Sequence, residues 1–106
     1  MIPEETKKLF IDRYKAFGDE KFYDFLINYA LNRVANGEIK QPNPATELLS
    51  YGEKFLKIYR IENDDTCLNL SRVCRRAAHK IYRFMLNKKM VKQNSKFLNL
   101  VENGSN

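Results

Sequence analysis

The sequence contains few of the residues from which catalytic and metal sites are usually built. Its 106 residues include one histidine, two cysteines and no tryptophan. The four glycines stand singly, so there is no glycine-rich loop that could cradle a phosphate group. No serine or cysteine lies in a recognisable nucleophile motif. We therefore expect a protein that is not an enzyme, with no catalytic site, no metal site and no cofactor.

The cysteines and the histidine also lack the spacing of metal ligands or of a disulfide. Cys67 and Cys74 are seven residues apart, and on one helix this separation gives about 10 Å of rise, beyond the ~7 Å Cα distance that a disulfide tolerates. His79 falls about 140° around the same helix from Cys74, which matches no zinc pattern. The sequence therefore predicts reduced thiols, as is usual inside a cell.

Long apolar runs are missing as well. No stretch reaches the roughly 18 apolar residues of a membrane helix, and the N-terminal segment MIPEETKKLF has no apolar core of a secretory signal. We therefore expect a cytoplasmic protein that does not bind membranes. Hydrophobic residues make up 43% of the chain and charged residues 30%, a balance typical of a folded protein, and the length suits one domain.

Periodicity and helix breakers together predict an all-α fold. Apolar residues recur at intervals of three and four, whereas the alternation typical of strands never persists. Breakers divide the chain into four helical segments, expected at about residues 3–16, from 19 toward Gly37, at 44–61 and from 65 to about 90. We predict a single-domain bundle of about four helices over residues 1–91, with the C-terminal helix longest and central. Residues 92–106 are expected to be a polar tail, either flexible or one short docked helix.

Each predicted helix has an apolar face that should form the core. The members are, in chain order, Leu9, Phe10, Tyr14 and Phe17; Phe22, Phe25, Leu26, Tyr29, Ala30 and Val34; Leu48, Tyr51, Phe55, Ile58 and Tyr59; and Val73, Cys74, Ala77, Ala78, Ile81, Phe84 and Met85.

Gly52 lies inside the third segment and permits two interpretations. It is either the turn glycine of a helix-turn-helix motif or a glycine within one continuous helix. The motif would require an apolar residue where Glu53 stands. A continuous helix, in which glycine costs ~1 kcal/mol relative to alanine, is the better interpretation.

Positive charge is concentrated in the last part of the chain. Residues 1–65 carry ten Lys and Arg against twelve acids, whereas residues 66–106 carry nine against one. Acids near helix N-termini are favoured by the helix dipole, but this effect does not account for cations within the body of the last helix. These cations have no acid three or four residues away. They are Arg72, Arg75, Arg76, Lys80 and Arg83, which we call the basic row.

On a helix the basic row and His79 share one arc of about 140°, opposite the apolar face. Three interpretations are open. The row is solvated or paired within the bundle with Asp12, Asp24 or Glu53; it binds nucleic-acid phosphates; or it binds an acidic protein partner, with Tyr82 as an aromatic anchor at its edge.

The leading functional hypothesis is a small non-enzymatic nucleic-acid-binding accessory or regulatory protein, of phage or mobile-element type. The alternative is a helical adaptor or inhibitor that docks on an acidic protein surface. A long helix can also provide a self-association face, which leaves a homodimer open.

Overall fold

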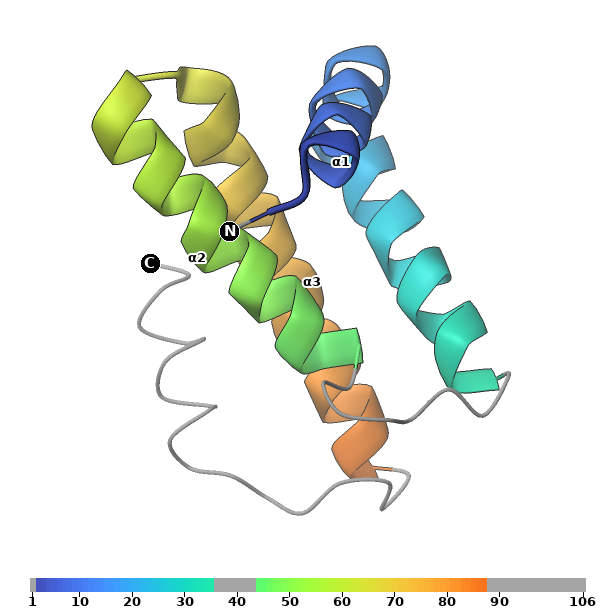
Figure 1. The fold of residues 1–106 in the computed structure, drawn as a ribbon. Helices are drawn as coiled ribbons and strands as arrows, with labels where there is room; N and C mark the ends of the chain where they lie inside the picture. The colour runs from blue at the N-terminus through green and yellow to red at the C-terminus, as the bar shows by residue number, and fades with distance from the viewer. Residues whose placement is uncertain (1, 36–43, 88–106) are drawn as a thin grey trace.

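The chain forms three helices in the computed structural model, which describes residues 2–35 and 44–87 (Figure 1). They are α1 (Glu4–Ala35), α2 (Pro44–Glu62) and α3 (Asp65–Asn87). The described ranges contain no strand, so the predicted all-α class is confirmed. None of their helices is both long and apolar enough to cross a bilayer. The predicted tail lies outside the described residues.

The expected count of four helices is wrong, because the first two predicted segments form one element, α1. The break expected at Gly18 exists as a kink with φ 79° and ψ 178°. Only glycine adopts these angles readily, and other residues pay ~1–3 kcal/mol there. No loop follows the kink, and the Tyr14 hydroxyl donates a hydrogen bond to the Asp19 carboxylate across it. The prediction that the C-terminal helix is the longest is also wrong for the described residues, because α1 has 32 residues and α3 has 23.

A tight turn joins α2 to α3 and makes them direct neighbours. Pro44 is the first residue of α2, as its fixed φ predicts. At the other end Asn63 adopts a left-handed φ of 57°, and its N–H donates to the Tyr59 carbonyl at 2.7 Å. The Asp64 carboxylate then accepts a hydrogen bond from the Thr66 N–H at 2.9 Å and so caps α3.

The third helix is the centre of the bundle, as the sequence predicts. It packs extensively against α2 and also against α1, whereas α1 and α2 have few contacts with each other. Ten of its 23 residues are buried, compared with six of 19 in α2. Ala77, Ala78 and Ile81 have no exposed surface, which confirms the predicted helical phase.

The predicted core face of α1 is only partly correct. Phe10, Phe22 and Leu26 are buried, but Leu9 and Tyr29 are 44% and 42% exposed. The reason is that α1 packs mainly on α3 and hardly touches α2. Its buried stripe is therefore narrower than its apolar face, and the flanking apolar side chains remain at the surface.

Helices α2 and α3 approach each other closely at Gly52. A β-carbon added there would lie 2.8 Å from the Arg75 Cγ and 3.2 Å from the Ser71 carbonyl oxygen. Because α2 is continuous from Pro44 to Glu62, the continuous-helix interpretation is confirmed. Glycine is present because the neighbouring helix leaves no space for a side chain. Cys67 and Cys74 are both buried and unbridged on α3.

Candidate functional site

The basic row lies on the outer side of α3. Arg72, Arg76, Lys80 and Arg83 are exposed or partly exposed, and Arg75 is partly buried. Members of the row contact two different helices, because they point toward opposite flanks of α3. Arg75 turns toward α2, whereas Arg76 turns toward α1.

Arg75 is anchored against α2. Its side chain passes over Gly52, and its Nε donates a hydrogen bond to the Ser71 carbonyl oxygen at 3.3 Å. Burial, followed by the charge of Arg72, lowers the pKa of the Arg75 guanidinium. Arg60 of α2 acts on this pKa in the same direction and Glu53 opposes it.

Arg76 is positioned by α1. Its guanidinium carbon lies 4.8 Å from the centroid of the Tyr23 ring, in a cation–π contact. Its nitrogen also lies 3.9 Å from a carboxylate oxygen of Glu20. That ion pair is long, and water reaches it because the two side chains are 47% and 80% exposed. Such a pair contributes little to stability, so the aromatic contact is the more defined part of this arrangement.

A hollow of about 320 Å³ lies where this part of α3 meets α1. We call it the α1–α3 hollow. Arg83 Nε donates a hydrogen bond to His79 Nε2 at 2.8 Å. The hollow is lined by Tyr23, Arg76, His79, Lys80 and Arg83.

The chemistry of the hollow suits a ligand that combines negative charge with a planar ring. Among the lining side chains that the structure describes, three are cations, one is an aromatic ring and none is an acid. Arginine presents a planar fork of donors that matches phosphate and carboxylate oxygens. The tyrosine ring and the guanidinium planes can stack on a flat partner.

The sulfur atoms do not take part in this site. Cys74 is completely buried, and burial raises the pKa of its thiol to about 12. Burial also raises the pKa of Cys67, with Asp64 acting in the same direction. Among residues 2–35 and 44–87, no three His, Cys, Asp or Glu side chains converge in a way that could hold a metal ion.

Two expectations about the surroundings of the row need correction. Tyr82, expected as an aromatic anchor at its edge, is only 3% exposed. In helical phase it lies between Ser71 and Arg75. The aromatic ring beside the row is instead Tyr23. It lies far away in the sequence, one position after the buried Phe22, and no local pattern connects it with α3.

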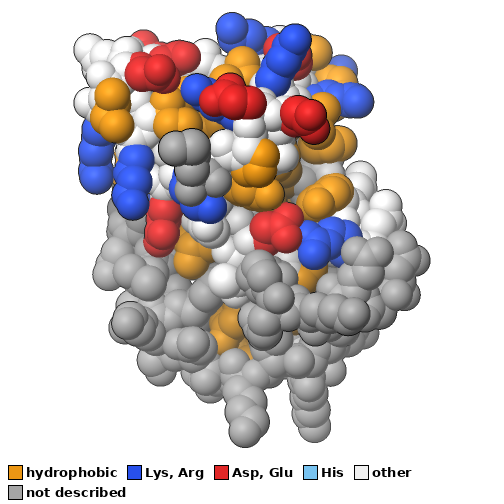
Figure 2. All heavy atoms as spheres, in the orientation of Figure 1, with side chains coloured by type: hydrophobic (Ala, Val, Ile, Leu, Met, Phe, Trp, Pro, Cys, Tyr) orange, Lys and Arg blue, Asp and Glu red, His pale blue; other side chains and the backbone are white. Residues whose placement is uncertain are grey.

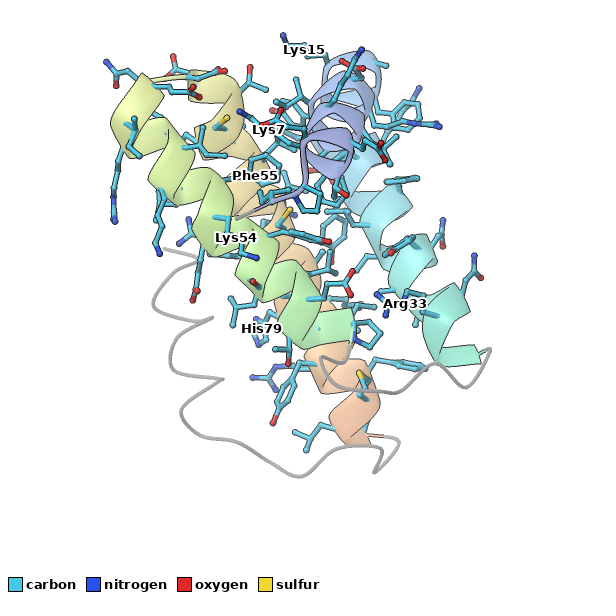
Figure 3. The ribbon with its side chains drawn as sticks, in the orientation of Figure 1. Lys7, Lys15, Arg33, Lys54, Phe55 and His79 are labelled. Carbon is cyan, nitrogen blue, oxygen red and sulfur yellow. The ribbon has the colours of Figure 1, made fainter. Side chains whose placement is uncertain are left out.

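The acids expected to pair with the row are also placed differently. Asp12, Asp24 and Glu53 are exposed, and Glu53 acts through its charge on the pKa of Arg75. Among the described residues, Glu20 forms an ion pair with Arg76. A much closer ion pair joins α1 to α2. Arg33 Nη1 lies 2.6 Å from Glu47 Oε2, and Figure 3 shows Arg33 on the part of α1 next to the start of α2.

The face formed by α1 and α2 has a different character. In Figure 2, Lys and Arg side chains lie beside Asp and Glu side chains, with hydrophobic side chains between them. Charges of both signs are therefore interspersed on this face, whereas the outer side of α3 carries a row of one sign. Comparison of the chain with protein-family models, with curated proteins and with solved structures found no match.

Proposed function

We propose that the protein is a small non-enzymatic nucleic-acid-binding accessory or regulatory protein, and that the basic row on α3 is its binding surface. One observation carries the proposal: Arg72, Arg76, Lys80 and Arg83 reach the surface together on one side of a single helix. From Arg72 to Arg83 the helix rises ~16 Å, which matches about five nucleotide steps of one strand at 3.4 Å each.

The electrostatic surroundings support binding rather than pairing within the bundle. The Glu20 carboxylate that reaches Arg76 is 3.9 Å away and mostly exposed. A phosphate can therefore approach Arg76 without first breaking a buried ion pair. Counterion release from the nucleic acid would then supply most of the affinity.

The test compares two triple variants that lose the same charge. One changes Arg72, Arg76 and Arg83 to Gln. The other changes Lys8, Lys15 and Lys21, which are exposed on α1, to Gln. We expect the first triple to weaken binding of DNA or RNA at least 10-fold more than the second. Its slope of log affinity against log salt should be smaller by roughly 0.7–0.9 for each lost phosphate contact.

Binding is measured by fluorescence anisotropy with single- and double-stranded oligonucleotides at about 50 and 200 mM salt. Melting curves establish that both variants are folded. Equal losses in the two triples would show that net charge, and not the basic row, is responsible. No binding by the parent protein at the lower salt concentration would eliminate the proposal.

An acidic protein surface is the second candidate partner. The stacked pair of Arg76 and Tyr23 favours it, because arginine and tyrosine are enriched in the energetic centres of protein interfaces. The variant Arg76→Lys separates the two candidates. It keeps the charge, so binding of a duplex through its phosphates should change less than about 3-fold, whereas a protein interface that requires the planar fork should lose about 10-fold or more.

A further inference from the structure

We propose that the α1–α3 hollow binds one unpaired nucleotide, so that the substrate class is single-stranded nucleic acid rather than a duplex. This inference rests on the proposed function and specifies its ligand. The hollow contains both kinds of group that such a nucleotide requires: an aromatic ring for the base and cations for the phosphates.

The base would stack on the pair formed by Tyr23 and Arg76. The Arg76 guanidinium already lies 4.8 Å from the Tyr23 ring centroid, so the two groups hold each other in place. Tyr23 lies in α1 and Arg76 in α3, both in regular helices, so little side-chain freedom is lost on binding. Aromatic rings and arginine planes are the usual stacking partners of unpaired bases.

The phosphates would contact Lys80 and Arg83. Both side chains line the same hollow and belong to consecutive turns of α3. The hydrogen bond from Arg83 Nε to His79 Nε2 orients the guanidinium plane. With no acid in the described lining, these side chains present only neutral and positive groups to the ligand. The volume of about 320 Å³ lies at the lower end of the roughly 300–1,000 Å³ found for small-ligand sites.

The position of Tyr23 argues against a duplex as the preferred ligand. In a double helix the faces of the bases are covered by their neighbours, and only base edges and the backbone are accessible. A duplex could contact the exposed cations of the basic row, but it could not stack a base on a ring in a hollow between two helices. Only an unpaired nucleotide uses the aromatic part of the site.

The experiment compares three ligands of the same length: oligo(dT), a duplex, and a single strand whose central nucleotides are abasic. A length of roughly 16 nucleotides covers known single-strand site sizes. We expect the parent protein to bind oligo(dT) at least 10-fold more tightly than the duplex. The abasic strand has the same number of phosphates, yet it should bind roughly 5- to 150-fold more weakly than oligo(dT), the range expected for one lost base stack.

Tyr23→Leu should weaken oligo(dT) binding by a similar factor and duplex binding by a clearly smaller one, because the duplex loses only the positioning of Arg76. Tyr23→Phe should retain the parent affinity for both. Equal affinity for oligo(dT) and the abasic strand would overturn the inference without any mutation of the protein. In that case loss of binding in the Arg72, Arg76 and Arg83 triple would leave the proposed function intact. A parent protein that binds none of the three ligands would refute both.

Discussion

The two interfaces of α3 are built in different ways. Toward α2 the contact is close, with glycine at position 52 and the Ser71 carbonyl and the Arg75 side chain directly opposite. Toward α1 the contact uses a large ring, Tyr23, and leaves the hollow beside it. The close interface brings two backbones together and has no room for a ligand, whereas the aromatic interface provides an accessible surface next to the cations.

Aromatic rings also explain how α1 is held against α2, although the two backbones come close at few points. Phe10 lies at the centre, with ring centroids 5.8 Å from Phe22 of the same helix and 5.2 and 6.0 Å from Tyr51 and Phe55 of α2. The kink at Gly18 folds the two halves of α1 so that Phe10 and Phe22 meet. Each such ring pair adds ~0.5–1.5 kcal/mol beyond its buried area.

The largest loss of stability is expected on the buried face of α3, which belongs to the core. Ala77 is completely buried, so Ala77→Asp would place a carboxylate without a partner among apolar groups. We expect a loss of more than about 4 kcal/mol in the free energy of unfolding, measured by urea denaturation. Arg72→Asp is the matched control, because it introduces the same side chain at an exposed position of α3 and should cost about 1 kcal/mol or less. Similar stability of the two variants would show that the helical phase of α3 is wrong.

A smaller loss of stability is expected at the close contact between α2 and α3 around Gly52. Gly52→Ala gains up to ~1 kcal/mol in helix propensity but overpacks the contact with α3, and we expect a net loss of about 1–2 kcal/mol. Arg75→Ala removes the Cγ that the new methyl group would meet at 2.8 Å. In a double-mutant cycle the two changes should therefore be coupled by about 1 kcal/mol.

Gly18→Ala is the control for this cycle. Among the described residues no atom lies within 4 Å of a β-carbon added at Gly18, so the expected cost of ~1–3 kcal/mol comes from the positive φ alone. This cost should be the same in the parent protein and in the Arg75→Ala variant. Additivity of Gly52→Ala with Arg75→Ala would show that the helices are not in close contact at this point.

The smallest loss of stability is expected at the kink within α1. Tyr14→Phe removes the hydrogen bond to Asp19 across the kink and should cost about 0.5–1.5 kcal/mol at neutral pH. Burial, followed by the hydrogen bond to Asp19, raises the pKa of Tyr14 from 10.0 to about 12. A raised pKa stabilises the fold below the unfolded value, and this contribution is lost as the pH rises from 10.0 toward about 12.

The measurement compares urea denaturation of parent and Tyr14→Phe at about pH 8 and again near pH 11.5. The other titrating groups are the same in both proteins and cancel in the difference. The advantage of the parent should shrink at the higher pH. An advantage that does not change with pH would contradict the shifted pKa of Tyr14.

How well the buried face of a helix could be predicted from the sequence depended on the number of helices that pack against it. The phase of α3 was predicted correctly at Ala77, Ala78 and Ile81, because a central helix with one charged face has its buried side fixed by the pattern itself. The phase of α1 was predicted less well. Leu9 and Tyr29 are apolar and in helical register, but whether they are buried depends on a second neighbour that α1 hardly contacts.

The sequence by itself determined the all-helical class, the break at Gly18 and the one-sided basic row, because rise, rotation and glycine dihedrals are local properties of the chain. Only the tertiary structure decided which side chains join the row. Tyr23 and Glu20 reach it from α1, whereas Tyr82, its neighbour in α3, is buried. The physical reason is that lateral neighbours are set by how side-chain volumes fit between helices. Gly52 permits close approach on one side of α3, and Tyr23 keeps an accessible hollow on the other.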